Sequence, residues 1–456
     1  MHRVHFIGVG GYSMSGLAVA LKAQGLVVTG SDARSSARTR LVEAAGIPVA
    51  IGHRADNVGS ADTVVYTSDV PDDNVERAAA VQRGLRVLHR SEILNHLLTG
   101  RRPILITGTA GKTTTTSMTG LILHRAGKDP LILAGGEMRD LDGQTVVLGR
   151  GPWVVAETDE SDGSFLRYRP EVAVVTNLEP EHLDHYGGRF ENLQGAMQRF
   201  LETIPGDGIA ILGADDAGLR ALGATLPVPT ATFGFHESSE WRGRDIREDP
   251  AGTDFEVVRD GKPIGRGWLP VPGLHNVQNA LAAIAASERA GVPIDEALDI
   301  LRGFVGAKRR FETVGTARGV RIVDDYAHHP SKMRAAVQAA HQLGGSRVVA
   351  AFQPQRYMRT AQLWDQFVEV LGDADLTVVS DIYGPPGEPP IDGVTSERLV
   401  AAARQAHPGA AIHYAPSLDD VVEWLTVRIQ PGDVVLTMGA GDIWRAAQAL
   451  YRRLAP

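Results

Sequence analysis

The sequence predicts an α/β protein with three domains, each built around a mainly parallel sheet. Short apolar runs alternate with segments of helical periodicity along the whole chain, which is the pattern of strands joined by helices. Several of these runs end in glycine-containing turns that open a helix, as in sheets that bind nucleotides. The chain has 456 residues, and at about 150 residues per domain this length suits about three domains.

Residues 1–100 are predicted to form a Rossmann-like domain. The strand in "VHFIGVGG" runs into glycines, and a helix follows in "SMSGLAVALKAQG". The dinucleotide fingerprint Gly-x-Gly-x-x-Gly has Ser13 at its third glycine position, which makes a nicotinamide site a weak interpretation. A glycine turn at a helix start can still bind a diphosphate through its backbone N–H groups. Two later strands end in polar residues, namely Ser31 and Asp32 in one case and Thr67 and Ser68 in the other.

Residues 101–306 are predicted to form a central domain that begins with a phosphate loop. In "ILITGTAGKTTTTS" a strand ends at Thr107, a glycine turn follows, and Lys112 opens a helix. The common phosphate-loop pattern would have its first glycine at Ile106, so this loop is a short variant. The alternative is an ordinary strand-to-helix turn with an incidental lysine. The candidate nucleotide-binding residues are Gly108, Thr109, Ala110, Gly111, Lys112, Thr113 and Thr114.

The chemistry of such a loop follows from the start of its helix. Free backbone N–H groups and the positive end of the helix dipole attract phosphate. Lys112 can reach the β- and γ-phosphates, and the Thr113 hydroxyl can bind Mg²⁺.

Acidic residues follow later strands of the same domain. Glu157 comes directly after "WVVA", and Asn177 ends the strand in "VAVVTN". Ligand sites of parallel sheets gather at the carboxyl ends of strands, so both side chains are expected near the phosphate loop. Carboxylates and histidine at that place suit a divalent cation, whereas a solvated acidic loop is the alternative. The segment "NLEPEHLDHY" adds Glu179, Glu181, His182, Asp184 and His185.

Two further features belong to the central domain. "HNVQN" places His275, Asn276 and Asn279 at a helix start, where they could frame an adenine or a phosphate. A helix cap with ordinary surface polar residues is the alternative. Short alternating segments between residues 230 and 270 predict an antiparallel patch.

Residues 307–456 are predicted to form a second Rossmann-like domain. Its strands are expected in "VRIVDDY", "RVVAAFQ", "LTVVSDIY" and "DVVLTMGAG", each followed by a helical stretch.

The composition argues against several classes of protein. The net charge of −8 disfavours a general nucleic-acid-binding surface, and the lack of cysteine excludes disulfides, thiolate catalysis and cysteine metal sites. No apolar run approaches the roughly 20 residues that cross a bilayer, and the N-terminal residues enter a strand pattern at once instead of a signal peptide. We therefore expect a cytoplasmic protein without nucleic-acid or membrane partners.

Ten motifs occur in order along the chain: "FIGVGGYSMSGLA", "GTAGKTTTTS", "AETDESDGSF", "TNLEPEHLDHY", "HNVQNALAA", "KRRFE", "DDYAHHP", "FQPQRYMRT", "DIYGPPGEPPIDG" and "MGAGDIW". Together they resemble the Mur ligases over essentially the whole chain. The resemblance implies that the first domain holds a UDP-sugar, the second ATP, and the third an amino acid. It also implies that Gly-Thr-x-Gly-Lys-Thr is the family's form of the phosphate loop, and that the N-terminal glycine turn binds the UDP diphosphate.

The resemblance implies an ATP-dependent ligase that uses Mg²⁺. For the oligomeric state we expect a monomer or a homodimer. It would join L-alanine to the lactyl carboxylate of UDP-N-acetylmuramate through an acyl phosphate, in peptidoglycan precursor synthesis. By motif, the metal ligands would be Thr113, Glu157 and His182. The ATP site would add Lys112, His275, Asn276, Asn279, Arg310 and Asp324 or Asp325. The UDP-sugar site would comprise Gly10, Gly11, Ser31, Asp32, His53, Thr67 and Ser68. The amino-acid site would comprise Tyr326, His328, Arg356 and Arg359. The catalytic residues would be Lys112, Glu157, His182, His328 and Arg356.

Three positions depart from the family pattern. Ser13 replaces a glycine of the UDP loop, Ala110 a histidine of the phosphate loop, and Gln355 a histidine before Arg356. These changes bear on rate, pH dependence and choice of amino acid. Three alternatives stay open at this point: a related ligase that adds another amino acid or a preformed peptide, a homologue that binds UDP-sugar or nucleotide without turnover, and an NAD-dependent oxidoreductase.

Overall fold

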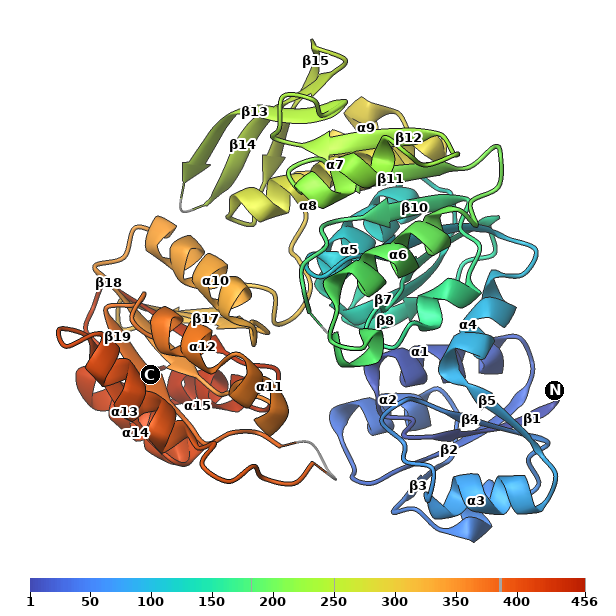
Figure 1. Ribbon diagram of the computed structural model, residues 1–456, viewed down its shortest axis with the longest axis horizontal. Helices are drawn as coiled ribbons and strands as arrows, with labels where there is room; N and C mark the ends of the chain where they lie inside the picture. The colour runs from blue at the N-terminus through green and yellow to red at the C-terminus, as the bar shows by residue number, and fades with distance from the viewer. Residues whose placement is uncertain (182, 250, 385–387, 456) are drawn as a thin grey trace. The chain divides into compact units, whose positions relative to one another are not determined.

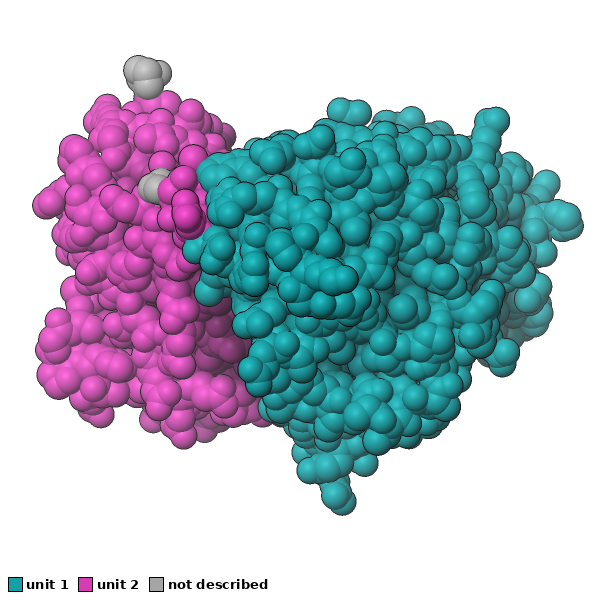
Figure 2. All heavy atoms as spheres, turned by 90° about the horizontal axis from the view of Figure 1, so that it is seen from above, with its two compact units in different colours: residues 1–246, 254–269, 274–307 teal, residues 247–253, 270–273, 308–456 magenta. Residues whose placement is uncertain are grey.

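The computed structural model describes residues 1–181, 183–249, 251–384 and 388–455, and these residues form three sheets (Figure 1). They divide into two compact units, which are coloured in Figure 2. Unit 1 comprises residues 1–246, 254–269 and 274–307, and unit 2 comprises residues 247–253, 270–273 and 308–456. The predicted α/β class is confirmed. The division into three domains with boundaries after residues 100 and 306 stays a prediction.

The N-terminal sheet of unit 1 has five parallel strands in the order β3-β2-β1-β4-β5. The strands are β1 (Arg3–Ile7), β2 (Val27–Asp32), β3 (Val49–Ile51), β4 (Thr63–Tyr66) and β5 (Arg86–His89). The helices are α1 (Tyr12–Ala23), α2 (Ala37–Ala44), α3 (Val75–Gln82) and α4 (Arg90–Leu98), with the 3₁₀ turn η1 (Ala55–Val58). This strand order is that of the first five strands of a Rossmann fold, as predicted.

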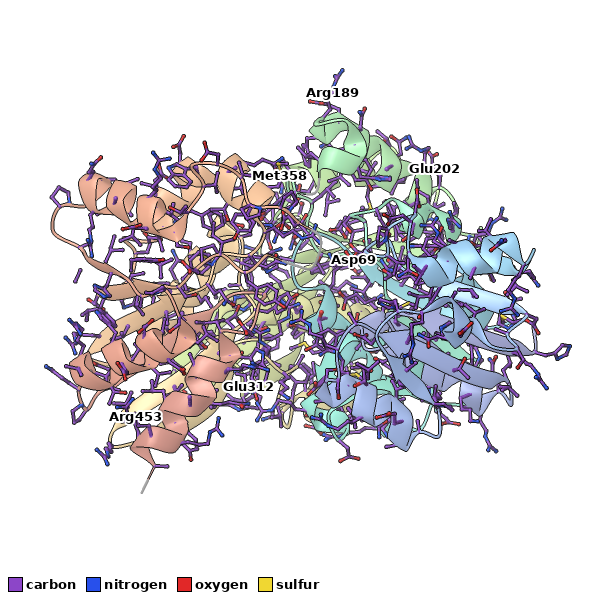
Figure 3. All side chains as sticks on the ribbon, turned by 90° about the horizontal axis from the view of Figure 1, so that it is seen from below. Asp69, Arg189, Glu202, Glu312, Met358 and Arg453 are labelled. Carbon is purple, nitrogen blue, oxygen red and sulfur yellow. The ribbon has the colours of Figure 1, made fainter. Side chains whose placement is uncertain are left out.

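The second sheet of unit 1 has ten strands in the order β15-β14-β13-β12-β11-β10-β6-β9-β7-β8. The strands are β6 (Arg102–Thr107), β7 (Leu131–Met138), β8 (Gln144–Val147), β9 (Trp153–Glu157), β10 (Val172–Val175), β11 (Ile209–Gly213), β12 (Thr230–Gly234), β13 (Trp241–Asp249), β14 (Gly252–Arg259) and β15 (Lys262–Leu269). The helices are α5 (Lys112–Arg125), α6 (Phe190–Leu201), α7 (Ala217–Gly223), α8 (Leu274–Arg289) and α9 (Ile294–Leu301), with the 3₁₀ turns η2 (Arg139–Leu141), η3 (Ser164–Arg167) and η4 (Leu183–Tyr186). Figure 3 marks Arg189 and Glu202 at the two ends of α6.

Strand β6 lies inside this sheet, between the parallel strands β9 and β10. Ile104, Leu105 and Ile106 are completely buried because helices cover both faces of a parallel sheet. The carboxyl end of β6 is therefore held rigidly, and the loop after it starts from a fixed point.

Antiparallel pairing occurs at both ends of the ten-stranded sheet. The antiparallel patch expected between residues 230 and 270 contains β12–β15, but the prediction is wrong for β12, which pairs parallel with both β11 and β13. Strands β14 and β15 are neighbours joined only by Asp260 and Gly261, both with positive φ, as a type I′ hairpin requires. At the other end β7 pairs antiparallel with β8, an edge that the sequence pattern did not indicate.

The sheet of unit 2 has the order β16-β17-β21-β18-β19-β20, and its only antiparallel pair among the described residues is β16 with β17. The strands are β16 (Glu312–Ala317), β17 (Val320–Asp325), β18 (Arg347–Phe352), β19 (Leu376–Val379), β20 (Ala411–Tyr414) and β21 (Asp433–Met438). The helices are α10 (Pro330–Gln342), α11 (Tyr357–Gln362), α12 (Trp364–Val370), α13 (Ser396–Ala406), α14 (Leu418–Arg428) and α15 (Trp444–Leu454). Strands β16 and β20 were not predicted.

Two apolar clusters cover the two faces of this sheet. One cluster joins the sheet to α10, α12 and α13, and the other joins it to α14 and α15. Neighbouring residues of β17 face opposite clusters, Val323 the first and Ile322 the second, because side chains alternate along a strand. Among the described residues no helix is long and apolar enough to cross a membrane.

Candidate functional site

The predicted phosphate loop connects β6 to α5. Gly111 is the N-cap of α5 with φ +82, and Gly108 has φ +123, so both have backbone conformations that favour glycine. A Cβ atom at Gly108 would collide with the Thr176 hydroxyl, and one at Gly111 would collide with the Asn279 amide. The loop therefore needs glycine at both positions for conformation and for space.

The residues after β10 hold the loop from one side. The backbone N–H of Ala110 donates to Asn177 Oδ1 at 2.8 Å, and the Thr176 hydroxyl donates to the Ala110 carbonyl at 2.5 Å. The Thr109 hydroxyl accepts from the backbone N–H of Glu179 at 2.8 Å. The backbone N–H of Ala110 thus already has a protein partner in this structure.

Lys112 forms an ion pair with the buried Glu160. Its Nζ donates to the two oxygens of Glu160 at 3.0 and 2.9 Å and to the Gly108 carbonyl at 2.7 Å. Burial opposes the charge of Lys112, but the carboxylates of Glu160, Asp159 and Glu157 outweigh burial and raise the pKa of Lys112. The lysine is therefore held as a cation beside the loop. Glu160 belongs to the "TDESD" segment but was not among the predicted site residues.

Thr113 and Glu157 bring two oxygen atoms together next to Lys112. The Thr113 hydroxyl donates to Glu157 Oε2 at 2.8 Å, and the same oxygen accepts from the backbone N–H of Gly135 at 3.0 Å. One hydroxyl and one carboxylate suit Mg²⁺, which takes few protein ligands and fills its shell with phosphate oxygens and water. The third predicted ligand, His182, lies outside the described residues. Among the described residues no three histidine or acidic side chains are arranged to hold a metal.

The start of α8 lies against the phosphate loop. Asn279 is buried, accepts from the Thr115 hydroxyl at 3.2 Å and packs on Gly111. Asn276 is also buried, 3.5 Å from Asn279 by their side-chain amides, whereas His275 is exposed. Thr114, in the first turn of α5, is buried too.

The predicted UDP residues lie at or just after the carboxyl ends of β1, β2, β3 and β4. Gly10 donates its N–H to Asp32 at 2.9 Å, and Gly11 is the N-cap of α1. The Ser31 hydroxyl lies 3.3 Å from His53 Nδ1. Thr67 and Ser68 directly follow β4.

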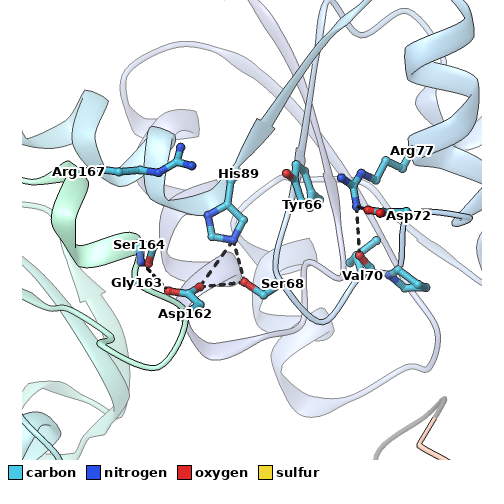
Figure 4. A pocket seen from close by; sticks show the side chains of 11 residues that line it. Tyr66, Ser68, Val70, Asp72, Arg77, His89, Asp162, Gly163, Ser164 and Arg167 are labelled. Atoms are coloured by element: carbon cyan, nitrogen blue, oxygen red, sulfur yellow. Dashed lines mark hydrogen bonds and ion pairs between the residues drawn. The ribbon is translucent and has the colours of Figure 1, made fainter. Parts of the chain in front are cut away.

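A cavity of about 520 Å³ opens beside Ser68 (Figure 4). Asp162 joins the N-terminal sheet to the acidic segment of the second sheet, because it accepts from Ser68 at 2.8 Å and from Arg90 at 3.4 Å. Ser68 also lies 3.1 Å from His89 Nε2, and burial and then the Arg90 guanidinium lower the pKa of His89. The cavity is lined by polar and charged side chains from both sheets, including Tyr66, Arg77, Ser164 and Arg167.

In unit 2 the two neighbouring aspartates have different surroundings. Asp324 is buried, pairs with Arg309 at 3.0 Å and accepts from the Thr437 hydroxyl at 2.6 Å. Asp325 is half-buried and accepts from the N–H groups of Phe311 and Ala327. Burial raises the pKa of Asp325 to about 6, against the opposing charge of Arg310. Of the two, we retain Asp325 as the ligand candidate, because it is half-buried whereas Asp324 is buried in an ion pair with Arg309.

The other candidates of unit 2 surround Tyr326. The His328 ring lies edge-on to the Tyr326 ring, with centroids 5.2 Å apart, and the Arg310 guanidinium lies 5.1 Å from the Tyr326 ring. Burial, followed by the charges of Arg359 and Lys332, lowers the pKa of His328 well below its ordinary value. His328 is therefore neutral near pH 7, and its Nδ1 lies 2.7 Å from the Tyr326 carbonyl.

The arginines lie at the start of α11. Arg356 is its N-cap with φ +71, a conformation that costs a non-glycine residue energy and is enriched at functional sites. Gln355 Oε1 accepts from Arg359 Nη1 at 2.5 Å. Gln355, one of the three departures from the family pattern, thus positions a predicted substrate residue.

The fold and these sites define an α/β protein with a phosphate loop in its largest sheet and a second glycine turn in its N-terminal sheet. Models of the Mur ligase family match nearly the whole chain: the "Mur ligase family, catalytic domain" at residues 3–102, the "Mur ligase middle domain" at 106–287, and the "Mur ligase, glutamate ligase domain" at 309–441. The chain belongs to the Mur ligase family.

Two relatives and two solved structures indicate the branch of the family. The UDP-N-acetylmuramate–L-alanine ligase of Symbiobacterium thermophilum is 49% identical over 99% of this chain and 94% of its own length. That of Pelotomaculum thermopropionicum is 43% identical over 99% and 97%. The UDP-N-acetylmuramate-alanine ligase structure from Thermotoga maritima matches with a TM-score of 0.86 at 29% identity over 99% of both chains. The murein peptide ligase from Psychrobacter arcticus matches with a TM-score of 0.74 at 27% identity over 100% and 99%.

Proposed function

We propose that this protein is an ATP-dependent ligase that joins L-alanine to the lactyl carboxylate of UDP-N-acetylmuramate. The observation that carries the proposal is the phosphate loop with Lys112 beside the Thr113–Glu157 oxygen pair, in a chain of this family. The names of its relatives support the choice of substrates. The cytoplasmic location and the monomeric or dimeric state remain predictions from the sequence.

The UDP-sugar would bind at the carboxyl edge of the N-terminal sheet. The Gly10–Gly11 turn and the start of α1 present backbone N–H groups to a diphosphate. The neighbouring cavity has room for a sugar, and its arginines Arg77 and Arg167 offer positive charge. Asp162 lines this cavity and belongs to the same acidic segment as Glu160, which binds Lys112 of the phosphate loop. A sugar bound in the cavity would therefore extend toward the phosphate loop.

ATP would bind with its phosphates on the loop from Gly108 to Thr114. Lys112 would leave Glu160 and turn to the phosphates, and Asn276 and Asn279 would line the nucleotide site. Thr113 and Glu157 would hold Mg²⁺, which supplies positive charge to the phosphate oxygens when it is bound.

The reaction must first activate a carboxylate, since oxide is a poor leaving group. Transfer of the γ-phosphoryl group of ATP to the lactyl carboxylate gives ADP and an acyl phosphate. The neutral amine of alanine then attacks the acyl carbon, and the tetrahedral intermediate loses one proton from its nitrogen to the surrounding water and expels inorganic phosphate, which leaves the amide. Lys112 would neutralise charge that develops on the transferred group, and most of the catalysis would be positioning and electrostatics.

The amino acid would bind through Arg356 and Arg359, whose planar guanidinium groups suit a carboxylate. The neutral His328 directs Nδ1 at the Tyr326 carbonyl, which leaves Nε2 as an acceptor. That nitrogen could accept a hydrogen bond from the amine.

One assay tests the proposal. The protein is mixed with Mg-ATP, UDP-N-acetylmuramate and single amino acids, and phosphate release and product mass are measured. L-alanine should give stoichiometric phosphate and product, and Lys112→Ala should abolish both. If glycine, serine or a preformed peptide is the better acceptor, the substrate assignment is wrong. If no acceptor gives phosphate although nucleotide binds, the ligase activity itself is wrong.

A further inference from the structure

A buried carboxylate lies directly beneath the predicted UDP residues. Glu76 is the second residue of α3 and is completely buried, as are His5 and Ser31. A buried charge is costly unless it is paired and hydrogen-bonded, so its partners indicate what it does there.

Glu76 binds groups from three separate segments of the chain, namely β1, β2 and residues 53–57. One oxygen accepts from the Ser31 hydroxyl at 2.5 Å and lies 3.2 Å from His5 Nε2. The other accepts from Asn57 Nδ2 at 2.6 Å and from the Arg54 N–H at 3.2 Å, and it lies 3.4 Å from His53 Nδ1. Burial acts against ionisation, but these hydrogen bonds dominate and lower the pKa of Glu76 to about 2. The carboxylate is therefore an anion at any physiological pH.

The anion determines where its neighbours carry their protons. Ser31 has one hydroxyl proton, and the short bond to Glu76 uses it, so toward its other neighbour, His53 Nδ1 at 3.3 Å, Ser31 can only accept. The nearby negative charge likewise favours the proton of His53 on Nδ1, which leaves Nε2 as an acceptor when the ring is neutral.

We propose that Glu76 is a positioning residue of the UDP-sugar site: directly and through the buried Ser31 it fixes the ring of His53, whose Nε2 then accepts a hydrogen bond from a donor group of the uridine moiety. The donors of uridine are its imide N–H and its ribose hydroxyls. This inference rests on the proposed function, because Ser31 and His53 are UDP-site residues only if the protein binds the UDP-sugar as predicted.

The test compares Glu76→Gln with Asp62→Asn. Glu76→Gln replaces one carboxylate oxygen by an NH2 group, which is a hydrogen-bond donor. The position opposite the Ser31 hydroxyl is then no longer certain to hold an acceptor. Asp62 is the matched control: its carboxylate also has a pKa of about 2 and accepts from the N–H groups of His2 and Arg3. Asp62 directly precedes β4 and therefore lies at the amino ends of the parallel strands, whereas Ser31 lies at their carboxyl ends.

We expect Glu76→Gln to raise KM for UDP-N-acetylmuramate by about 10-fold or more, as for the loss of a charged hydrogen bond, with kcat and KM for ATP unchanged. Asp62→Asn should lower the melting temperature without changing any KM. In the double variant Glu76→Gln/Ser31→Ala the KM increase should fall well short of the product of the two single increases, because Glu76 acts through Ser31.

An unchanged KM in Glu76→Gln, or fully multiplicative effects in the double variant, would overturn the proposal. If Glu76→Gln does not fold, Glu76→Asp is the alternative variant, which keeps the charge but moves it away from Ser31. It should raise KM for UDP-N-acetylmuramate to a smaller extent. An unchanged KM in Glu76→Asp would also overturn the proposal. Calorimetry with UDP alone distinguishes a failure of this inference from a failure of the proposed ligase function. A protein that binds UDP in a Glu76-dependent way but releases no phosphate contradicts the ligase function and supports this inference.

Discussion

At the scale of single residues, several charged side chains of this protein already bind other side chains in the absence of substrate. Lys112 pairs with Glu160, Glu76 binds Ser31, and Asp324 pairs with Arg309. In each pair the carboxylate is buried, so exchanging its partner has a large effect.

The pair of Lys112 and Glu160 makes a direct prediction for nucleotide affinity. Glu160 competes with phosphate for Lys112, so Glu160→Gln should bind ADP more tightly than the wild type, as measured by calorimetry. The variant should also lose about 2 kcal/mol of unfolding free energy without nucleotide, since a charged hydrogen bond disappears. Lys112→Ala, which removes the cation instead, should weaken ADP binding. Unchanged or weaker ADP binding by Glu160→Gln would show that the pair does not compete with nucleotide.

Asp62 makes a prediction for the pH dependence of stability. Its pKa is about 2 in the folded protein against 3.8 for an ordinary aspartate, so its stabilising effect is present above pH 4 and is lost as the pH falls toward 2. Asp62→Asn should therefore be less stable than the wild type at pH 7, and the difference should shrink between pH 4 and pH 2. Denaturant unfolding at several pH values measures this difference. A gap that stays constant down to pH 2 would contradict the assignment.

At the scale of elements, the two ends of α5 have glycines with similar backbone conformations and different surroundings. Gly111 has φ +82 and packs against Asn279, whereas Gly127 has φ +70 and open space where a Cβ would lie. The same substitution at both ends therefore separates backbone strain from steric collision.

Gly111→Ala and Gly127→Ala should both lose about 1–2 kcal/mol of stability from left-handed backbone strain. Only Gly111→Ala should also weaken nucleotide binding, because its Cβ displaces Asn279 and the loop. Thermal unfolding and ADP calorimetry on the two variants measure the two effects. Equal ADP affinities would mean that the loop tolerates a side chain at Gly111.

At the scale of the whole molecule, unit 2 contains a complete sheet with an apolar cluster on each face. We expect a fragment of residues 308–456 to fold by itself, with α/β circular dichroism and cooperative thermal unfolding. Its far-ultraviolet spectrum should match the contribution expected from its helices and strands. A fragment that is unfolded or aggregated would show that unit 2 depends on unit 1 for its core.

Local signals in the sequence were sufficient for the class of fold and for the phosphate loop. The glycine turn, the start of α5 at Lys112 and the alternation of strands and helices depend on neighbours within a few residues, and the structure has all three. The ordered motifs also indicated the family, which the comparisons bear out. The assignment of individual site residues stays a prediction.

Tertiary structure alone decided which polar residues are partners. Glu76 is 45 positions from Ser31, and Glu160 is 48 positions from Lys112, so no local pattern links them. Asp324 and Asp325 are adjacent in sequence, yet alternation along β17 gives one a buried ion pair and the other a half-buried place. The antiparallel edge strands β8 and β16 could likewise not be predicted from the sequence, because the pairing of an edge strand depends on which strand lies beside it. Local sequence determines turns and helix starts, whereas the packing of distant segments determines which charges meet.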